Sequence, residues 1–264
     1  MLGIGPQIFD FVPIWTWALM ITRFMGILMV LPGIGTDQFP REYRFSAAAL
    51  LSVAVVFSGV RAPEPKELST MLLMLSSEFA AGFVLGLIPS FVLAGLAVAG
   101  QTISGAIGLT QANMIDPSLG VAVSLLSRLK TLLATSIFLI IGGHHVVIRA
   151  AAGLDGNAAL GAFTADGHVA EILTQQFSNS FHLALMVSVP IMVTSLVTQF
   201  LLGLVSKFVP QLNIFIVAMP LLLIIGLYMS AYTLYGLREV ILDEFSKVQG
   251  TIFDIFPELQ DKQT

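Results

Sequence analysis

The chain has no cysteine among its 264 residues. This absence excludes disulfide bonds, thiolate catalysis and cysteine-based metal sites. Charge is also scarce, since Asp, Glu, Lys and Arg together make up 11% of the residues, against about 25% in an ordinary soluble domain. The formal net charge is −4, and no basic patch is present. We therefore expect no binding to nucleic acid, which basic surfaces recognise.

Apolar residues are abundant instead, at 56% of the chain, and the mean hydropathy is +0.91. A soluble globule of this size could not bury so much apolar surface, so lipid or partner protein must cover it. The sequence therefore predicts an all-α integral membrane protein. No Lys or Arg precedes Arg23, so the basic region of a cleaved signal peptide is missing and the first helix is expected to be retained.

About six apolar segments are expected to form long helices, at 11–31, 46–60, 68–98, 131–148, 177–206 and 208–237. The second is short for a span of about 20 residues, whereas the last two exceed the bilayer core and should tilt, kink or project beyond it. After residue 237, apolar residues recur every three or four positions and predict an amphipathic helix, interrupted by Gly250 and limited by Pro257. The glycine-rich stretch 151–171 predicts an exposed loop or a poorly ordered excursion.

Motifs of catalysis and nucleotide binding are missing: the sequence has no P-loop, no HExxH and no G-x-S-x-G elbow. His144 and His145 are adjacent, and neighbouring side chains on a helix diverge by about 100°. The two rings are therefore not expected to chelate one ion together. We expect no enzymatic activity, no cofactor and no metal site.

Two ionisable residues, Arg23 and Glu78, lie inside apolar segments. Each would be unfavourable in a membrane unless it is paired or reached by water. The two are candidates for an intramembrane ion pair with each other. A structural tie between helices, or a contact with another subunit, is favoured, and a proton relay is the functional alternative.

The stretch GQTISGAIGLTQANMIDPSLG, at residues 100–120, is rich in glycine and amides. Irregular backbone at membrane depth is tolerated only where protein buries it or where it lines a water-filled cavity. One interpretation is therefore a pore-lining or re-entrant loop. Close helix packing through small residues, followed by an ordinary loop at Asp116–Pro117, is equally supported.

The stretch SKFVPQLNIFIVAMP, at residues 206–220, places polar residues and prolines between two apolar runs. Pro210 breaks a helix, and the Gln211 and Asn213 side chains can bond the freed backbone groups. These features predict a helical hairpin with Lys207 near its tip, and Pro220 should bend the second helix. The alternative is a kink in one continuous helix.

Several motifs resemble the FliR/SctT family of type III export-gate proteins. They are, in chain order, GFVLGL (82–87), AGQTIS (99–104), the Asp116–Pro117 pair, FLIIGGHHVVI (138–148), SVPIMV (188–193) and PQLNIF (210–215). PQLNIF is the most specific of them. The chain departs from the family pattern at Arg128 and Lys130 and in its doubled histidine.

The resemblance implies a helical assembly with FliP and FliQ in the bacterial inner membrane, at the flagellar basal body. Residues from 1 to about 130 would be FliP-like, and residues from about 131 to 264 would be a FliQ-like hairpin with an amphipathic tail. The assembly would pass unfolded rod, hook and filament subunits, with FlhB and rod proteins such as FliE as further partners. In such a complex, the hairpin residues Lys207, Pro210, Gln211, Asn213 and Pro220 would pack against other subunits.

The resemblance also implies that a loop of this chain plugs the closed pore. By position, its residues are Gly105, Ile107, Gly108, Leu109, Met114, Ile115, Asp116 and Pro117. The alternative function is a secondary transporter or channel for a small solute. Such a protein is expected to carry polar residues on broken, repeated helices near the midplane, and no repeat of this kind is visible.

Overall fold

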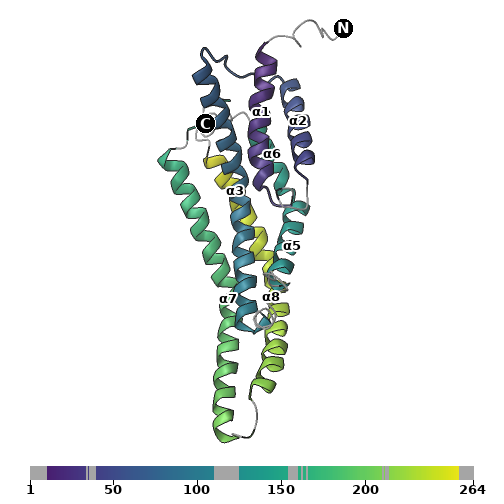
Figure 1. Ribbon diagram of the computed structural model, residues 1–264, viewed down its shortest axis with the longest axis vertical. Coiled ribbons are helices and arrows are strands. Elements are labelled where there is room, and N and C mark those ends of the chain that lie inside the picture. The colour runs from purple at the N-terminus through teal and green to yellow at the C-terminus, as the bar shows by residue number, and fades with distance from the viewer. Residues whose placement is uncertain are drawn as a thin grey trace. The chain divides into compact units, whose positions relative to one another are not determined.

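The computed structural model describes residues 11–33, 35, 40–109, 125–153, 160–161, 163–164, 166–209, 211 and 214–255. Every regular element within these ranges is helical, which confirms the all-α prediction. The helices, coloured along the chain in Figure 1, are α1 (Phe11–Val30), α2 (Arg41–Phe57), α3 (Leu68–Ala106), α5 (Leu125–Ile140), α6 (Gly143–Ala152), α7 (Gly167–Phe208) and α8 (Ile214–Asp254).

Three of these helices, α1, α3 and α7, are long and apolar enough to cross a membrane. The number rises to five if α5 with α6, and the two parts of α8, each count as one bent span. Helix α2 has 17 residues and is not among these spans, as its short apolar run predicted. The chain is therefore a multi-pass membrane protein.

The residues cluster by contact into two compact units. The first comprises Met1–Ser90, Phe138–Gln176 and Phe245–Thr264, and the second comprises Phe91–Ile137 and Phe177–Glu244. Helices α3, α5, α7 and α8 contribute residues to both units. The FliP-like and FliQ-like parts expected from the resemblance are divisions along the chain, and they remain predictions.

In the first unit, α1 packs against α2, α3 and α6 and supplies much of the buried core, including Trp15, Leu19 and Phe24. Its backbone approaches that of α3 closely at three glycines. A Cβ on Gly26 would lie 2.7 Å from the Phe83 nitrogen, and a Cβ on Gly82 would lie 2.8 Å from the Arg23 carbonyl carbon. Gly86 faces α1 one turn further on. The Gly82–Gly86 spacing is the small-xxx-small pattern by which membrane helices pack closely.

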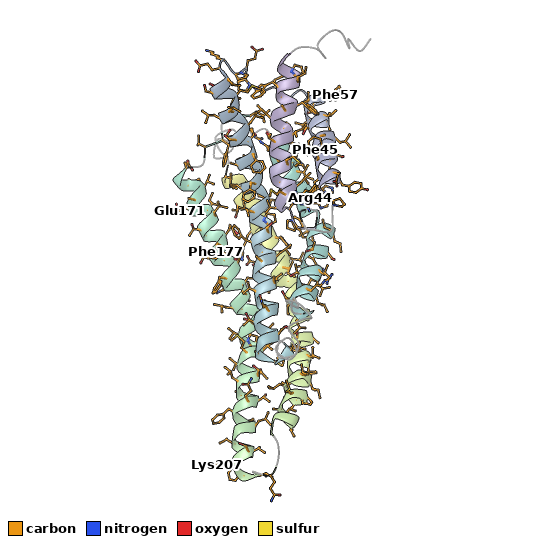
Figure 2. All side chains as sticks on the ribbon, in the orientation of Figure 1. Arg44, Phe45, Phe57, Glu171, Phe177 and Lys207 are labelled. Carbon is orange, nitrogen blue, oxygen red and sulfur yellow. The ribbon has the colours of Figure 1, made fainter. Side chains whose placement is uncertain are left out.

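Helix α2 places small residues, Ala48, Ser52 and Val55, on its buried face. Its large apolar side chains lie on the other side and are exposed. Phe45 is 54% exposed and Phe57 is 81% exposed, and both extend away from the ribbon in Figure 2. An outward face more apolar than the inward one requires lipid or partner protein around it.

The predicted single segment 131–148 is wrong, because the chain breaks at Gly142 into α5 and α6, which are bent by 59°. Gly142 has a φ of +76°, a conformation that glycine adopts without strain. Its N–H donates to the Leu139 carbonyl at 3.2 Å. The apolar character of the run concealed this break, since Ile141 and Gly142 lie between two apolar stretches.

The predicted interruption of the C-terminal tail at Gly250 is also wrong, because α8 continues from Ile214 through to Asp254. One glycine in a helix interior costs about 1 kcal/mol, and buried apolar side chains on the same helix outweigh it. They are Ile241, Phe245, Val248 and Ile252. The Phe245 ring packs on Phe138 with centroids 4.9 Å apart. Pro257 and Leu259 lie outside the described residues.

The stretch 151–171 was predicted to be an exposed loop, and this is wrong at several described positions. Ala151 and Ala152 complete α6 and are buried. Leu160 and Phe163 are buried as well, at 5% and 8% exposure. Apolar side chains spaced among glycines fold back onto the first unit, a tertiary effect that a local composition does not reveal.

Within the second unit, glycines again allow close approach between helices. A Cβ on Gly95 would lie 3.1 Å from the Ser180 carbonyl carbon, and one on Gly100 would lie 2.6 Å from the Ser127 nitrogen. The Ser127 hydroxyl donates to the Ala97 carbonyl at 2.8 Å. The later part of α3 is thereby packed against α5 and α7.

Candidate functional site: the end of α3 and the hairpin of α7 and α8

Helix α3 ends where the predicted gating loop begins. The Ile107 N–H still donates to the Ile103 carbonyl at 3.0 Å, whereas the Gly108 N–H donates to Gly105 at 3.2 Å in a tighter turn. Gly108 has a φ of +84°, a conformation that residues other than glycine rarely adopt. The chain therefore leaves the helix axis at this residue.

Two other helices of the second unit hold this end of α3. The Ile107 side chain is 1% exposed and rests on Gly226 of α8, where a Cβ would lie 2.8 Å from the Ile107 Cβ. From α7, the Gln199 Nε2 donates to the Ala106 carbonyl at 3.3 Å. This bond satisfies one of the carbonyls that a helix C-terminus leaves without an intrahelical partner.

The predicted gating residues are described only in part. Gly105 lies within α3 and is exposed, with no atom within 4 Å of a Cβ built on it. Ile107, Gly108 and Leu109 form the turn that follows. The remaining predicted residues lie outside the described ranges: Met114, Ile115, Asp116 and Pro117. The plugging role of the whole segment stays a prediction.

The region 206–220 joins two separate helices, as the hairpin interpretation expected. Helix α7 ends at Phe208 and α8 begins at Ile214. Lys207 lies in the last turn of α7, where a cation is favourable beside the helix carbonyls, and it extends from the helix end in Figure 2. Gln211 is exposed. Pro220 lies inside α8. Pro210 and Asn213 are outside the described residues.

The last turns of α7 are apolar and exposed on nearly every side. From residue 199 to 209, only Leu202 and Ser206 are half-buried, and the rest are exposed. The large apolar side chains among them are Phe200, Leu201, Leu204, Val205, Phe208 and Val209. A helix that is apolar all round is stable only inside lipid or protein, so this tip needs apolar surroundings that the described residues do not supply.

Arg23 of α1 and Glu78 of α3 form the ion pair that the sequence suggested, and both side chains are fully buried. The Arg23 Nη1 also donates to the Ala151 carbonyl at 3.0 Å. The second carboxylate oxygen of Glu78 accepts the Gly161 N–H at 2.6 Å. The pair thus links α1, α3, α6 and the chain at residue 161, which fits a structural tie.

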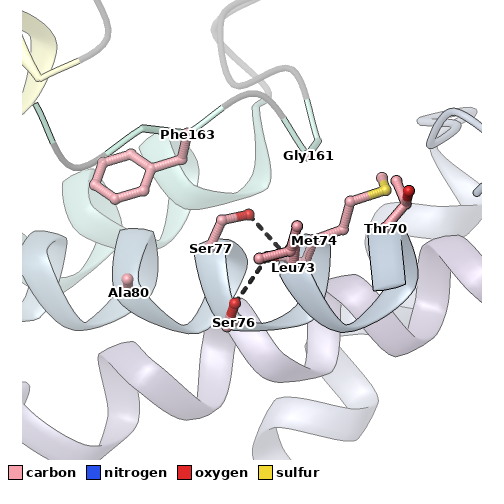
Figure 3. Close-up of a pocket in the computed structure, with 8 residues that line it drawn as sticks. All are labelled: Thr70, Leu73, Met74, Ser76, Ser77, Ala80, Gly161 and Phe163. Carbon is pink, nitrogen blue, oxygen red and sulfur yellow. Dashed lines mark hydrogen bonds between the residues drawn. The ribbon is translucent and has the colours of Figure 1, made fainter. Parts of the chain in front are cut away.

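An open groove of about 610 Å³ lies beside this pair on α3 (Figure 3). Its lining residues are Thr70, Leu73, Met74, Ser76, Ser77, Ala80, Gly161 and Phe163. The Ser76 and Ser77 hydroxyls each donate to a carbonyl of their own helix at 2.9 Å. No carboxylate, imidazole or amine lines the groove, so its described wall offers no acid or base for catalysis.

Two further polar features lie on α5 and α6. Lys130 is 1% exposed, and its Nζ has no hydrogen-bond partner among the described residues. The rings of His144 and His145 lie with centroids 4.0 Å apart, and the expectation that they do not chelate one ion together stays a prediction. Among the residues described, no three His, Asp or Glu side chains gather as metal ligands would.

Sequence reasoning missed the residues that hold the end of α3. Gln199 is a polar residue in an exposed apolar run. Gly226 is a glycine, without a side chain, among the large apolar residues of α8. Both exceptions were visible signals. Their partners, Ala106 and Ile107, are distant in sequence, so the contact itself required the structure.

Comparison with known proteins identifies the family. Residues 14–248 match the family described as bacterial export proteins, family 1. The flagellar biosynthetic protein FliR of Aquifex aeolicus (strain VF5) is 30% identical over 213 residues, covering 80% of this chain and 82% of that protein. FliR of Bacillus subtilis (strain 168) is 27% identical over 251 residues, covering 91% and 93%. The Yop proteins translocation protein T of Yersinia pestis is 24% identical over 214 residues, covering 79% and 82%.

The matches extend over most of the chain, and they confirm the resemblance drawn from its motifs. The predicted location, a multi-pass protein of the bacterial inner membrane, agrees with the apolar helices and with this group of relatives. The chain belongs to bacterial export proteins family 1, the FliR/SctT family, and is a membrane component of a bacterial protein export apparatus.

Proposed function

We propose that the chain is a core subunit of the flagellar type III export gate. Together with FliP and FliQ it forms the channel through which unfolded rod, hook and filament subunits cross the inner membrane. The observation that carries this proposal is the similarity to flagellar FliR proteins over most of the chain. Flagellar FliR proteins cover up to 93% of this chain at 24–30% identity, and the Yop translocation protein covers 79% at 24% identity; the wider coverage supports the flagellar role.

The exposed apolar surfaces support assembly with other membrane helices. The last turns of α7 and the outward side of α8, with Val217, Ile224 and Tyr228 at 47%, 66% and 72% exposure, are open to a partner. FliP and FliQ would cover these surfaces. FlhB and rod proteins such as FliE would then contact the assembled complex.

The gating role is assigned to the residues beginning at Gly105 and ending at Pro117. Three observations support it. The helix ends at the start of this segment, Gly108 turns the chain away from the helix axis, and the contacts of Ile107 and Ala106 fix the point of departure. A short segment rich in small residues can close a pore by packing and move aside at low cost.

Deleting the gene in a flagellated host that carries it tests this function. We expect loss of swimming and of secreted hook and filament proteins, with both restored by the intact gene, and co-purification of the chain with FliP and FliQ. Normal flagella in the deletion strain would contradict the proposal. Purification as a stable monomer that binds a small solute would favour the transporter alternative instead.

A further inference from the structure

We propose that the groove on α3 in the first unit is a binding site for a phospholipid with a zwitterionic headgroup of the phosphatidylethanolamine type. A hydrocarbon chain of this lipid lies in the groove along α3. Its headgroup is bound by the connector, residues 61–67, which joins α2 to α3. Four observations carry this assignment: the polarity of the groove wall, the dimensions of the groove, its level in the membrane and the charges at its end.

The wall of the groove suits an apolar ligand. Its large side chains are those of Leu73, Met74 and Phe163, and in Figure 3 Phe163 lies across from the side chains of α3. The Ser76 and Ser77 hydroxyls already donate to carbonyls of their own helix at 2.9 Å. None of the lining residues is charged. A ligand in this groove therefore gains most of its binding free energy by covering apolar surface.

The dimensions of the groove fit a hydrocarbon chain better than a helix. The lining residues of α3 run from Thr70 to Ala80, a length of about 15 Å at a rise of about 1.5 Å per residue. This length is half of a bilayer core of about 30 Å, the depth of one leaflet. A volume of about 610 Å³ spread over that length gives a mean cross-section of about 40 Å², whereas a helix about 10 Å across occupies about 80 Å². The groove therefore admits lipid chains and is too narrow for a helix of a partner protein.

The contacts of α1 place one end of the groove at a membrane surface. The candidate spans on α1 and α3 begin at Pro13 and Leu68, at the same end of the first unit (Figure 1). The two tryptophans of the chain, Trp15 and Trp17, lie near this end, and the Trp15 Nε1 donates to the Pro63 carbonyl of the connector at 3.2 Å. Tryptophan is enriched where a membrane meets water. The connector therefore lies at the level of the lipid headgroups, and the groove extends from it into the hydrocarbon.

The charges of the connector match a zwitterionic headgroup. Its four charged residues are all exposed: Arg61, Glu64, Lys66 and Glu67. Glu67 is three residues before Thr70, the first residue of α3 that lines the groove. The two cations suit the phosphate of a phospholipid, and the two carboxylates suit its ammonium group. An ammonium with N–H donors can bond a carboxylate, whereas a trimethylated ammonium has no donor. The connector therefore favours phosphatidylethanolamine over phosphatidylcholine and over an anionic lipid.

The headgroup is tested with the full-length chain in liposomes that contain equal parts of phosphatidylethanolamine, phosphatidylcholine and phosphatidylglycerol. One lipid at a time carries a photoreactive group in the middle of an acyl chain, and mass spectrometry locates the attached label. We expect the phosphatidylethanolamine label on lining residues of the groove, at about 2- to 5-fold the yield of the other two lipids, as exposed ion pairs allow. Lys66→Gln should reduce this preference, whereas Arg41→Gln, at an exposed arginine of α2, should preserve it.

The groove is tested by Ser76→Phe, because the new ring would occupy the space of the hydrocarbon chain. We expect the label in the groove to fall by about 5-fold or more, since the ring and the chain would overlap. Ala94→Phe, at an exposed position of α3 outside the groove, is the matched control and should leave the label unchanged. Thermal unfolding checks that both variants are folded. If Ser76→Phe is not, Thr70→Phe, at an exposed position that also lines the groove, replaces it.

Three results would overturn the lipid site: a label spread evenly over the exposed residues of α3, equal labelling by the three lipids, or equal loss of label in Ser76→Phe and Ala94→Phe. A second measurement addresses a protein as the occupant. A photoreactive amino acid in place of Ser76, in cells that carry the export apparatus, should attach to lipid. Attachment to another protein subunit would also overturn the proposal, because a partner would then fill the groove.

Discussion

Helix α3 is held by very different contacts at its two ends. In the first unit, Glu78 pairs with a buried arginine, and Gly82 touches the backbone of α1 directly. At the other end, a side-chain hydrogen bond from Gln199 reaches Ala106, and Ile107 packs on Gly226. One end of the helix is thus held by a buried ion pair and backbone contact, and the other by a side-chain hydrogen bond and side-chain packing.

Replacing Glu78 by alanine should have the largest effect. Arg23 would then be buried without a counter-charge, which destabilises a protein by about 3–5 kcal/mol. We expect little folded protein in the membrane and a much lower unfolding temperature in detergent. Glu171→Ala, a change at an exposed carboxylate of the same unit, should leave both unchanged. Equal stability of the two variants would show that the pair is not an anchor.

Alanine substitutions at Gly82 and Gly105 should separate the two ends of α3. At Gly82 the new Cβ would overlap the Arg23 backbone, and we expect a loss of about 1–3 kcal/mol. At Gly105 the space is open. Because alanine favours a helix more than glycine does, Gly105→Ala should leave the protein's stability unchanged or raise it by up to about 1 kcal/mol. Thermal unfolding of each variant measures both values. A loss at Gly105 as large as that at Gly82 would contradict the contrast.

The two buried cations Arg23 and Lys130 differ in their partners. Arg23 forms an ion pair, whereas the Lys130 Nζ has no hydrogen-bond partner among the described residues. Lys130→Met keeps an unbranched side chain, one atom shorter, and removes the buried amine, so stability should rise by about 1–3 kcal/mol. Chemical unfolding in detergent is the measurement, with the exposed Arg128→Met as a neutral control. A loss of stability would show that a carboxylate outside the described residues pairs with Lys130.

The smallest effect is expected at the hairpin turn. Replacing Pro210 and Asn213 with alanine removes a helix breaker and a turn-forming amide, so α7 and α8 should join less sharply. We expect a partial drop, about two- to fivefold, in the share of chain recovered with FliP and FliQ, as follows from about 0.5–1 kcal/mol. Unchanged recovery would remove these two residues from subunit packing.

The sequence alone predicted an all-α protein and two separate helices in the region of α7 and α8, because apolar runs and prolines are local signals. It placed Arg23 and Glu78 as candidates for a pair, since an isolated charge in an apolar segment needs a partner. The break at Gly142 and the continuity of α8 through Gly250 were predicted wrongly. In both cases tertiary packing and backbone conformation outweighed the local pattern.

The contacts at the end of α3 could not be predicted, for a different reason. Gln199 and Gly226 each stand out in an apolar run, yet nothing local indicates that their partners are Ala106 and Ile107. Such pairings depend on how distant helices come together. The small-xxx-small spacing of Gly82 and Gly86 was a signal for close packing, but it does not name the helix that packs there.

The most direct test of the account measures ion conductance through the closed complex with FliP and FliQ, with and without residues 106–115. If the segment that follows α3 closes the channel, the shortened chain should still assemble with both partners, and the complex should leak ions. An assembled complex that conducts no more than the unaltered one would contradict the central claim, that this chain is a gate subunit whose closing segment begins at the end of α3.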